Sequence, residues 1–326
     1  MKPLKIISTG AYIPERVVTN DDLSKMVDTS DAWIRERTGI RERHIAADDE
    51  CTSILGAKAL EDACRRADMA PGDLDAIIVG TSTPDAIFPS TACWLEHTLG
   101  LSGTPAFDVM AGCSGFLYGL EVAAGLLASG AARRVGLVGA ECMSRVVDWT
   151  DRRTCVLFGD GAGAAIVEPG DGSTGVLASN WGSDGTLAEI LCVPAGGARE
   201  PASEKTLEDR RHFVQMEGSR VFIHAVKAMS RSVRDALEAA GLSGADVDVF
   251  IPHQANLRIM DATRERTGIP ADRVFSVLDR YGNISAASVP VAIHEAREQG
   301  VLKDGDILAL TAFGTGLTWA GAVLRV

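Results

Sequence analysis

The sequence predicts an α/β protein built from two similar halves. Short aliphatic runs bounded by glycine, such as 74–79 and 134–139, are typical of buried parallel strands. Segments with apolar residues at helical spacing separate these runs, and this alternation favours helices packed against parallel sheets. The order helix, strand, helix, strand, turn, helix, strand occurs twice along the chain, which predicts an internal duplication.

The first half accounts for the chain up to about residue 172. It begins with a strand at 4–8. Helices are then expected at 21–27, 31–37, 52–66, 89–99 and 115–128, and strands at 74–79, 106–109, 134–139, 154–158 and 164–168. The glycine-rich run 159–163 lies between the last two strands. A phosphate-binding loop would require a helix after it, so we do not interpret it as one.

The second half repeats this plan. Helices are expected at 221–240, 256–267 and 286–299, and strands at 247–251, 274–277 and 306–310. Residues 169–212, which are rich in glycine, proline and charge, are expected to form an insertion or lid. No low-complexity linker separates the halves 1–172 and 173–326, which favours one fused body.

Composition excludes several classes of protein. The chain has 326 residues and a formal net charge of −12, which disfavours nonspecific nucleic-acid binding. It contains no uncharged run of eighteen apolar residues, so we expect no membrane span. Seven scattered cysteines without a Cys-x-x-Cys pair predict neither a disulfide framework nor a metal site, and they favour a reducing cytoplasm.

Cys113 is the first candidate for chemistry. It lies on the turn between the strand 106–109 and the small-residue helix that follows. Unpaired N–H groups and the helix dipole at such a turn favour a thiolate, which is a nucleophile. The alternative interpretation of a lone cysteine is a small residue packed against the sheet.

Three polar segments follow strands of the second half, where α/β sheets usually place their sites. They contain His253, Asn283 and the turn Gly314–Gly316. The duplication brings them to the same side as Cys113, so together they predict acyl-transfer chemistry. Taken singly, His253 is equally consistent with a structural histidine, Asn283 with a turn residue, and Gly314–Gly316 with an ordinary tight turn.

These segments resemble those of the β-ketoacyl-acyl carrier protein synthase III family, thiolase-superfamily condensing enzymes that start fatty acid synthesis. The resemblance includes Ala-Gly-Cys-Ser-Gly at 111–115, and the matching segments are 29–44, 107–116, 151–154, 158–163, 252–258, 281–290 and 313–319. It implies a thiolase-like five-layer αβαβα fold, a homodimer, acyl-CoA and malonyl-acyl carrier protein as substrates, and no permanently bound cofactor or metal.

The resemblance also implies roles for individual residues. Cys113 is the acylated nucleophile, His253 and Asn283 stabilise the enolate formed by decarboxylation, and the backbone N–H groups of Cys113 and Thr315 form the oxyanion hole. The implied CoA-binding residues are Thr29, Trp33, Arg37, Arg152, Gly218, Phe222, Ala255 and Asn256. The implied carrier-protein docking residues are Arg258, Arg264, Arg266 and Arg220, and Phe88 closes the acyl pocket of the dimer partner.

Some residues depart from the family pattern. Thr315 stands between glycines where some members have a third glycine, and Arg153 stands beside the expected adenine site where glycine is common. Ile223 and Glu265 replace basic residues on the docking surface. Two alternatives to the condensing enzyme remain at this stage: an acyltransferase or starter-unit enzyme of a polyketide or other natural-product pathway, and a catalytically silent acyl-binding partner.

Overall fold

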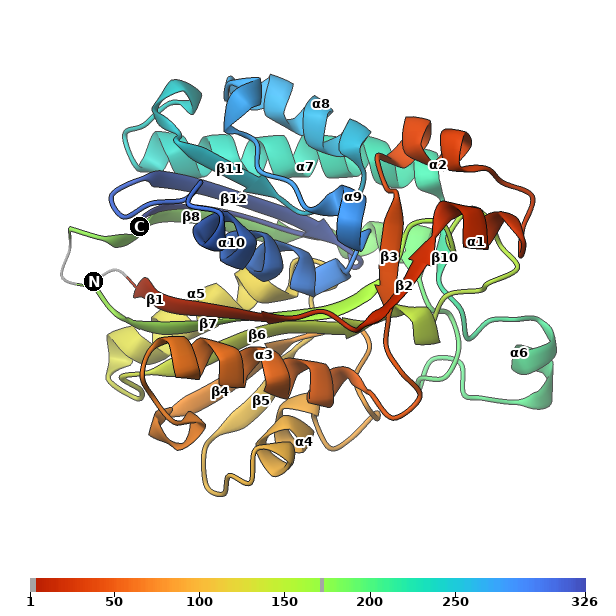
Figure 1. Ribbon diagram of the computed structural model, residues 1–326, viewed down its shortest axis with the longest axis horizontal. Helices are drawn as coiled ribbons and strands as arrows, with labels where there is room; N and C mark the ends of the chain where they lie inside the picture. Colours follow the sequence, from red (N-terminus) through yellow and green to blue (C-terminus); the bar gives the residue numbers. More distant parts are fainter. Residues whose placement is uncertain (1–3, 171–172) are drawn as a thin grey trace.

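The computed structural model describes residues 4–170 and 173–326, which form two large β-sheets with helices between and around them (Figure 1). The first sheet has the strand order β1 (Leu4–Tyr12), β7 (Asp160–Pro169), β6 (Val135–Cys142), β4 (Ala76–Gly80), β5 (Ala106–Val109). The second has the order β11 (Val249–Pro252), β12 (Ile307–Gly314), β13 (Thr318–Arg325), β8 (Gly175–Ser183). Parallel pairing joins β4 to β5 and β6, and β11 to β12, as the predicted crossover helices require.

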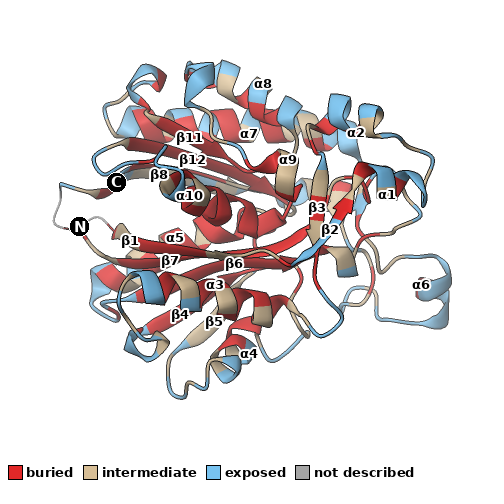
Figure 2. Cartoon of the chain, in the orientation of Figure 1, coloured by how far each residue is buried: buried red, intermediate tan, exposed pale blue. Residues whose placement is uncertain are grey.

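Helices form the other three layers. α5 (Gly115–Ser129) and α10 (Ser288–Glu298) lie between the sheets, where Figure 2 shows mostly buried residues. α3 (Thr52–Arg66) and α4 (Thr91–Thr98) cover the outer face of the first sheet, and α7 (Gly218–Ala239) and α8 (Leu257–Thr267) cover that of the second. The expected five-layer αβαβα fold is therefore confirmed.

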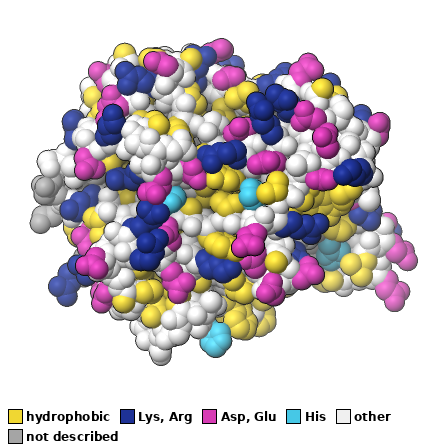
Figure 3. All heavy atoms as spheres, in the orientation of Figure 1, with side chains coloured by type: hydrophobic (Ala, Val, Ile, Leu, Met, Phe, Trp, Pro, Cys, Tyr) yellow, Lys and Arg dark blue, Asp and Glu magenta, His cyan; other side chains and the backbone are white. Residues whose placement is uncertain are grey.

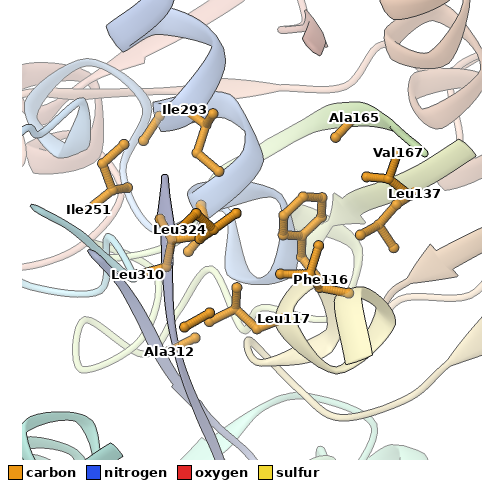
Figure 4. Packing of buried hydrophobic residues seen from close by; sticks show 14 of the residues in the cluster. Phe116, Leu117, Leu137, Ala165, Val167, Ile251, Ile293, Leu310, Ala312 and Leu324 are labelled. Carbon is orange, nitrogen blue, oxygen red and sulfur yellow. The ribbon is translucent and has the colours of Figure 1, made fainter. Parts of the chain in front are cut away.

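One hydrophobic core joins the two sheets. Phe116 and Leu117 of α5 pack between Leu137 of the first sheet and Leu310 of the second, and Ile293 of α10 completes the contact (Figure 4). All five side chains are at most 2% exposed. Burying an aliphatic or aromatic side chain of this size contributes roughly 1.5–3 kcal/mol to folding, so the halves stabilise one another.

Smaller elements gather at one end of the sheets. They are the hairpin β2 (Arg16–Thr19) and β3 (Glu42–Ile45), the helices α1 (Asn20–Ser24), α2 (Asp31–Thr38), α6 (Glu204–Glu208) and α9 (Leu278–Tyr281), and the short pair β9 (Leu191–Cys192) and β10 (Gln215–Met216). Figure 1 shows them on the side opposite the labelled chain termini.

The glycine-rich run 159–163, which was expected to lie between two strands, is mostly part of one strand, and no strand forms at 154–158. Most of the run belongs to β7, which starts at Asp160. A Cβ on Gly163 would lie 2.6 Å from the backbone nitrogen of Val291 on α10. Glycine is therefore required for the close approach of the central helix to the strand, not for a turn.

The expected strand at 274–277 is also wrong. Only Val274 makes a bridge, to Phe250. The Gln254 side-chain oxygen accepts hydrogen bonds from the Val277 N–H at 3.0 Å and the Ser276 hydroxyl at 2.9 Å, replacing the ladder contacts that a strand would make.

The region 169–212 is more ordered than expected, because it contains the strand β8. The C-terminal strand β13, which the sequence analysis did not predict, pairs with β8. The proposed boundary between residues 172 and 173 touches residues 171–172, which lie outside the described residues. The strands on either side of this boundary, β7 and β8, belong to different sheets. The division of the chain into two halves stays a prediction.

One segment within the described ranges, Gly112–Ser129, has the length and hydropathy of a membrane-crossing helix. It consists of α5 and the turn before it, and half of it is buried between the two sheets. Its apolar character is that of a core helix.

Candidate active site

Cys113 lies on the turn between β5 and α5, against the turn that follows β12. Gly112 has a φ of +56°, and a Cβ there would lie 2.5 Å from the Thr315 nitrogen. A Cβ on Gly314 would lie 2.4 Å from the Cys113 nitrogen, and one on Gly80 would lie 2.6 Å from the carbonyl carbon of Gly115. Glycines at these positions let three backbone segments meet around the cysteine.

Two cavities meet at Cys113. The larger has a volume of about 460 Å³ and also contains His253 and Asn283 in its wall. The smaller has a volume of about 310 Å³ and includes Thr315 in its wall. Cys113 therefore borders both the larger cavity and a smaller chamber, whose walls also share Phe158 and Leu191.

Burial acts on the Cys113 thiol in the direction opposite to the expected effect of the helix start. Burial raises its pKa to about 12, and the nearby Glu141 carboxylate acts in the same direction. A hydrogen bond donated by the Ser285 hydroxyl to Sγ, at 3.3 Å, opposes this change only partly. Burial therefore favours the protonated form of the Cys113 thiol.

His253 is buried at the end of β11, with an exposed fraction of 2%. Burial lowers its pKa to about 3, so the imidazole is neutral. Its Nδ1 lies 2.6 Å from the Ser288 hydroxyl oxygen, which also accepts the Gln254 N–H at 3.4 Å. In the tautomer in which the Ser288 hydroxyl donates to Nδ1, the ring proton lies on Nε2.

This neutral imidazole predicts a loss of stability in acid. The unfolded imidazole has a pKa of about 6.5 and the folded one about 3, so the unfolded state binds more protons between these values and unfolding becomes easier as the pH falls. At pH 5, about 1.5 units below the unfolded pKa, the cost is about 2 kcal/mol at roughly 1.36 kcal/mol per unit. Between pH 7 and pH 5, the free energy of unfolding of the His253→Gln variant should fall by about 2 kcal/mol less than that of the parent protein. Urea unfolding at both pH values measures the difference.

The matched control is His97→Gln, because His97 is exposed on α4. It should retain the acid sensitivity of the parent protein. Equal acid sensitivity of the His253→Gln variant and the parent would contradict the assignment of a neutral, buried His253.

The orientation of Asn283 follows from one hydrogen bond. Its Oδ1 accepts the backbone N–H of Ser285 at 2.9 Å. The side-chain Nδ2 is thereby left to donate into the cavity that Cys113 and His253 also line. Two uncharged donors, His253 Nε2–H and Asn283 Nδ2–H, therefore serve the same cavity.

Most of the predicted CoA-binding residues lie along the larger cavity. Its wall includes Trp33, Arg37, Arg152, Gly218, Phe222, Ala255 and Asn256, together with Arg153 and Arg258. The guanidinium carbons of Arg37 and Arg152 lie 4.7 Å and 5.4 Å from the Trp33 ring centroid. Arg153 forms an ion pair with Asp151 at 2.8 Å, so its charge is partly compensated.

Other predicted residues lie apart from this cavity. Thr29 is not part of its wall, and its hydroxyl is buried without a hydrogen-bond partner. Arg220 pairs with Glu217 at 3.1 Å and Arg264 with Glu265 at 3.2 Å, while Arg266 is exposed on α8. Phe88 lies on the protein surface and is 83% exposed.

Sequence reasoning missed Glu141, Ser285 and Ser288 as members of the site. Ser285 and Ser288 lie inside the segment 281–290, where the sequence analysis gave them no role, and Glu141 is the second-last residue of the otherwise apolar strand β6. The sequence signal that pointed to Glu141 was an acidic residue within an otherwise apolar strand. Among the described residues, no three His, Cys, Asp or Glu side chains gather in the manner of a metal site.

Comparisons with known proteins agree with this geometry. The family model "3-Oxoacyl-[acyl-carrier-protein (ACP)] synthase III" matches residues 107–185, and the model of its C-terminal part matches residues 237–326. The β-ketoacyl-[acyl-carrier-protein] synthase III of Caldanaerobacter subterraneus is 50% identical over 320 residues, which cover 98% of this chain and 97% of that protein.

Solved structures extend the similarity to the fold. The 3-oxoacyl-[acyl-carrier-protein] synthase III of Aquifex aeolicus has a TM-score of 0.91 and 44% identity, with 99% of this chain and 100% of that chain covered. The priming β-ketosynthase of the R1128 polyketide pathway has a TM-score of 0.91 and 35% identity, with 100% and 96% covered. The chain therefore belongs to the β-ketoacyl-acyl carrier protein synthase III family.

Proposed function

We propose that this protein catalyses the decarboxylative condensation of an acyl-CoA primer with malonyl-acyl carrier protein, which initiates fatty acid synthesis. The observation that carries the assignment is the meeting of Cys113, His253 and Asn283 in the wall of one cavity. The family membership supports the same reaction, and the two alternative functions are not favoured by the comparisons.

The first half-reaction uses Cys113. Its sulfur attacks the thioester carbonyl of the acyl-CoA, and the carbonyl oxygen gains negative charge. The backbone N–H groups of Cys113 and Thr315 supply two donors for that oxyanion. Their closeness is supported by the contacts of Gly112 and Gly314, and the Thr315 hydroxyl is directed to the Leu191 carbonyl oxygen rather than to the oxyanion. CoA leaves and the acyl group stays on Cys113.

The second half-reaction uses His253 and Asn283. Malonyl-acyl carrier protein loses carbon dioxide, and the charge moves to its thioester oxygen as an enolate. The Nε2–H of His253 and the Nδ2–H of Asn283 donate to this oxygen, and the carbanion attacks the acyl group on Cys113. No step calls for a permanently bound cofactor, because the chain and its two substrates supply every reacting group.

The experiment that tests this function supplies the purified protein with acetyl-CoA or a branched primer and malonyl-acyl carrier protein. We expect release of carbon dioxide and a β-ketoacyl product. Failure to release carbon dioxide with any short primer would refute the assignment. Transfer to alcohol or amine acceptors instead would indicate a natural-product acyltransferase, and absence of an acyl adduct on Cys113 would indicate a silent acyl-binding partner.

Trp33 is proposed to stack on the adenine of CoA, next to Arg152. Arg152 donates to the backbone oxygen of Asp28 at 2.6 Å, which ties the two sides of the cavity mouth together. Arg37 is suited to a phosphate group. Thr29 lies outside this cavity wall, whereas Gly218, Phe222, Ala255 and Asn256 are proposed to line the pantetheine arm.

Replacing Trp33 by alanine should weaken CoA binding about 5- to 160-fold, because stacking of a base on an aromatic ring is worth roughly 1–3 kcal/mol. Isothermal titration with CoA measures the change. Trp94→Ala is the matched control, since Trp94 is partly exposed on α4 and outside the cavity. An unchanged affinity of the Trp33→Ala variant would contradict the stacking role.

A homodimer is proposed from the surface around β5. This strand is at the edge of the first sheet, pairing with β4 on one side, and a partner can cover such an edge. Ile87, Phe88 and Met110 are 81%, 83% and 69% exposed, which is unusual for large apolar side chains on a monomer. In this arrangement Phe88 closes the acyl pocket of the partner.

The carrier protein is proposed to dock on α7 and α8, beside the mouth of the larger cavity. Arg258 borders the mouth, and Arg220, Arg264 and Arg266 lie on the same two helices. Ile223 is 63% exposed and offers an apolar contact at a position where the family pattern has a basic residue. On the face in Figure 3, basic and acidic side chains are intermixed, so this docking depends on a local set of arginines.

A cytoplasmic location is proposed from the cysteines. All seven are free thiols, and thiols of this kind persist in a reducing compartment. The net charge of −12 supports the absence of a nucleic-acid partner, and the buried position of α5 supports the absence of a membrane span.

A further inference from the structure

Arg43, on β3, places a positive charge in the interior of the protein. Its side chain is fully buried, with 0% exposed. Burial lowers the pKa of its guanidinium to about 10, so the group is still protonated at neutral pH. Arginine is seldom buried to this extent without an oppositely charged partner, because removing a charge from water is costly. The position of Arg43 therefore needs an explanation.

The hydrogen bonds of Arg43 join the hairpin region to the segment 156–159. Nη1 donates to the Val18 carbonyl oxygen at 3.1 Å and to Oδ1 of Asn20 at 2.9 Å. Nη2 donates to the Val156 carbonyl oxygen at 2.9 Å, and Nε is buried without a hydrogen-bond partner. Among the described residues, the guanidinium is thus held by uncharged oxygens from three places in the chain.

The segment 156–159 depends on such contacts, because it belongs to none of the sheets that the described residues form. It joins the turn at 152–157 to β7. The stem of Arg43 also packs against it. A Cβ on Gly159 would lie 3.0 Å from the Cβ of Arg43, and a Cβ on Gly282 would lie 3.4 Å from the same atom. Arg43 therefore lies directly behind this segment and the turn that carries Asn283.

Asn283 is paired with the same segment through its backbone. Its N–H donates to the Leu157 carbonyl oxygen at 2.9 Å, and its carbonyl oxygen accepts the Gly159 N–H at 3.1 Å. Phe158, between these two residues, forms a β-bridge with Asn283. Leu157, Phe158 and Asn283 all line the larger cavity. A displacement of the segment that Arg43 holds is therefore passed on to Asn283.

We propose that Arg43 positions Asn283 for the condensation half-reaction by holding the segment 156–159 in place. Arg43 is a positioning residue, because it acts on Asn283 through the backbone from behind the cavity wall. The Nδ2–H of Asn283 must point at the enolate oxygen, and small displacements of such a donor are costly. The inference rests on the proposed function for the half-reaction that Asn283 serves.

Arg43→Met tests this role. Methionine fills part of the space of the arginine stem and removes the hydrogen bond to Val156. The kcat for condensation by enzyme acylated beforehand should fall about 10- to 100-fold, because a small misplacement of a reacting group can cost about 10²-fold. Acylation of Cys113 by acetyl-CoA should stay within about 3-fold of the parent rate, since that half-reaction does not use Asn283.

A double-mutant cycle with Asn283→Ala separates positioning from a general structural role. Alanine leaves no side-chain donor to position, so adding Arg43→Met should reduce condensation by at most about 2-fold further. Substitutions that act independently have effects that multiply. A further loss of about 10-fold or more in the Asn283→Ala background would therefore overturn the proposal.

Arg297→Met is the matched control. Arg297 lies on α10, is partly buried with an unpartnered Nε, and lines a separate small cavity. This variant should keep the parent rates of acylation and condensation. If Arg43→Met does not fold, Arg43→Lys takes its place, because lysine keeps the charge but has one nitrogen where the guanidinium has two donating to separate partners. It should show a smaller loss that is confined to condensation, and a parent rate of condensation would overturn the proposal.

Amide hydrogen exchange tests the positioning without catalysis. In the Arg43 variants the N–H groups of Asn283 and Gly159 should exchange at least about 10-fold faster relative to the amides of α4, because their segment has lost a charge-assisted hydrogen bond. Parent exchange rates at both groups would overturn the proposal, as would equal slowing of acylation and condensation. If the parent protein releases no carbon dioxide, the proposed function fails, and the exchange rates still decide whether Arg43 holds Asn283.

Discussion

Replacing Cys113 by alanine is expected to abolish product formation with every acyl-CoA primer. No other atom in the wall of the larger cavity combines a nucleophilic sulfur with the adjoining backbone N–H groups of the turns at 112–113 and 314–315. Removing the nucleophile of a covalent mechanism leaves no acyl-enzyme, so we expect a loss of at least about 10⁴-fold. Mass spectrometry of the protein after incubation with acetyl-CoA measures the adduct directly.

The control for this experiment is Cys93→Ala, because Cys93 lies on α4 and outside both cavities at Cys113. It should carry one acyl group per chain, like the parent. An acyl adduct of normal yield on the Cys113→Ala variant would place the nucleophile at another of the seven thiols.

Replacing Asn283 by aspartate should lower condensation by about 10²–10³-fold, the usual cost of losing one oxyanion donor. Aspartate has the same shape and can still accept the Ser285 N–H, so the turn should be preserved. It exchanges the donated Nδ2–H for an oxygen that repels the enolate. The measurement is carbon dioxide release from malonyl-acyl carrier protein by enzyme that was acylated beforehand.

Acylation of Cys113 provides the internal control for Asn283→Asp, because that half-reaction uses the backbone donors of Cys113 and Thr315. It should proceed at close to the parent rate. Condensation at the parent rate would show that Asn283 makes no contact with the reacting oxygen, and a parallel fall in acylation would indicate damage to the turn.

Much of the site could be predicted because its residues follow strands. The aliphatic runs before Cys113, His253 and Gly314 indicate strands, and strand ends of a duplicated sheet converge in space. α3 at Thr52–Arg66 and β5 at Ala106–Val109 agree with the prediction residue for residue, since clear periodicity and glycine boundaries mark them. The roles themselves came from the family resemblance rather than from these patterns.

The remaining features depend on contacts that sequence patterns do not encode. The glycines of β7 resemble a loop until α10 is packed against them. Glu141 becomes buried, and Ser285 takes its unusual φ, only in the folded chain. There Glu141 accepts hydrogen bonds from Thr81 and Ala286, which lie 60 and 145 positions away in the sequence. The pKa of Cys113 is raised because distant segments bury its thiol, and the local sequence does not show this burial.

The close backbone contacts around Cys113 have a consequence for redesign of the enzyme. Gly80, Gly112 and Gly314 leave no space for added side chains, so the backbone turn that carries Cys113 is closely packed. The smaller chamber is bounded instead by Met110, Val193 and Val214, side chains outside the central helices. We therefore expect the range of primers to change through substitutions in the residues that bound this chamber, while the turn that carries Cys113 stays the same.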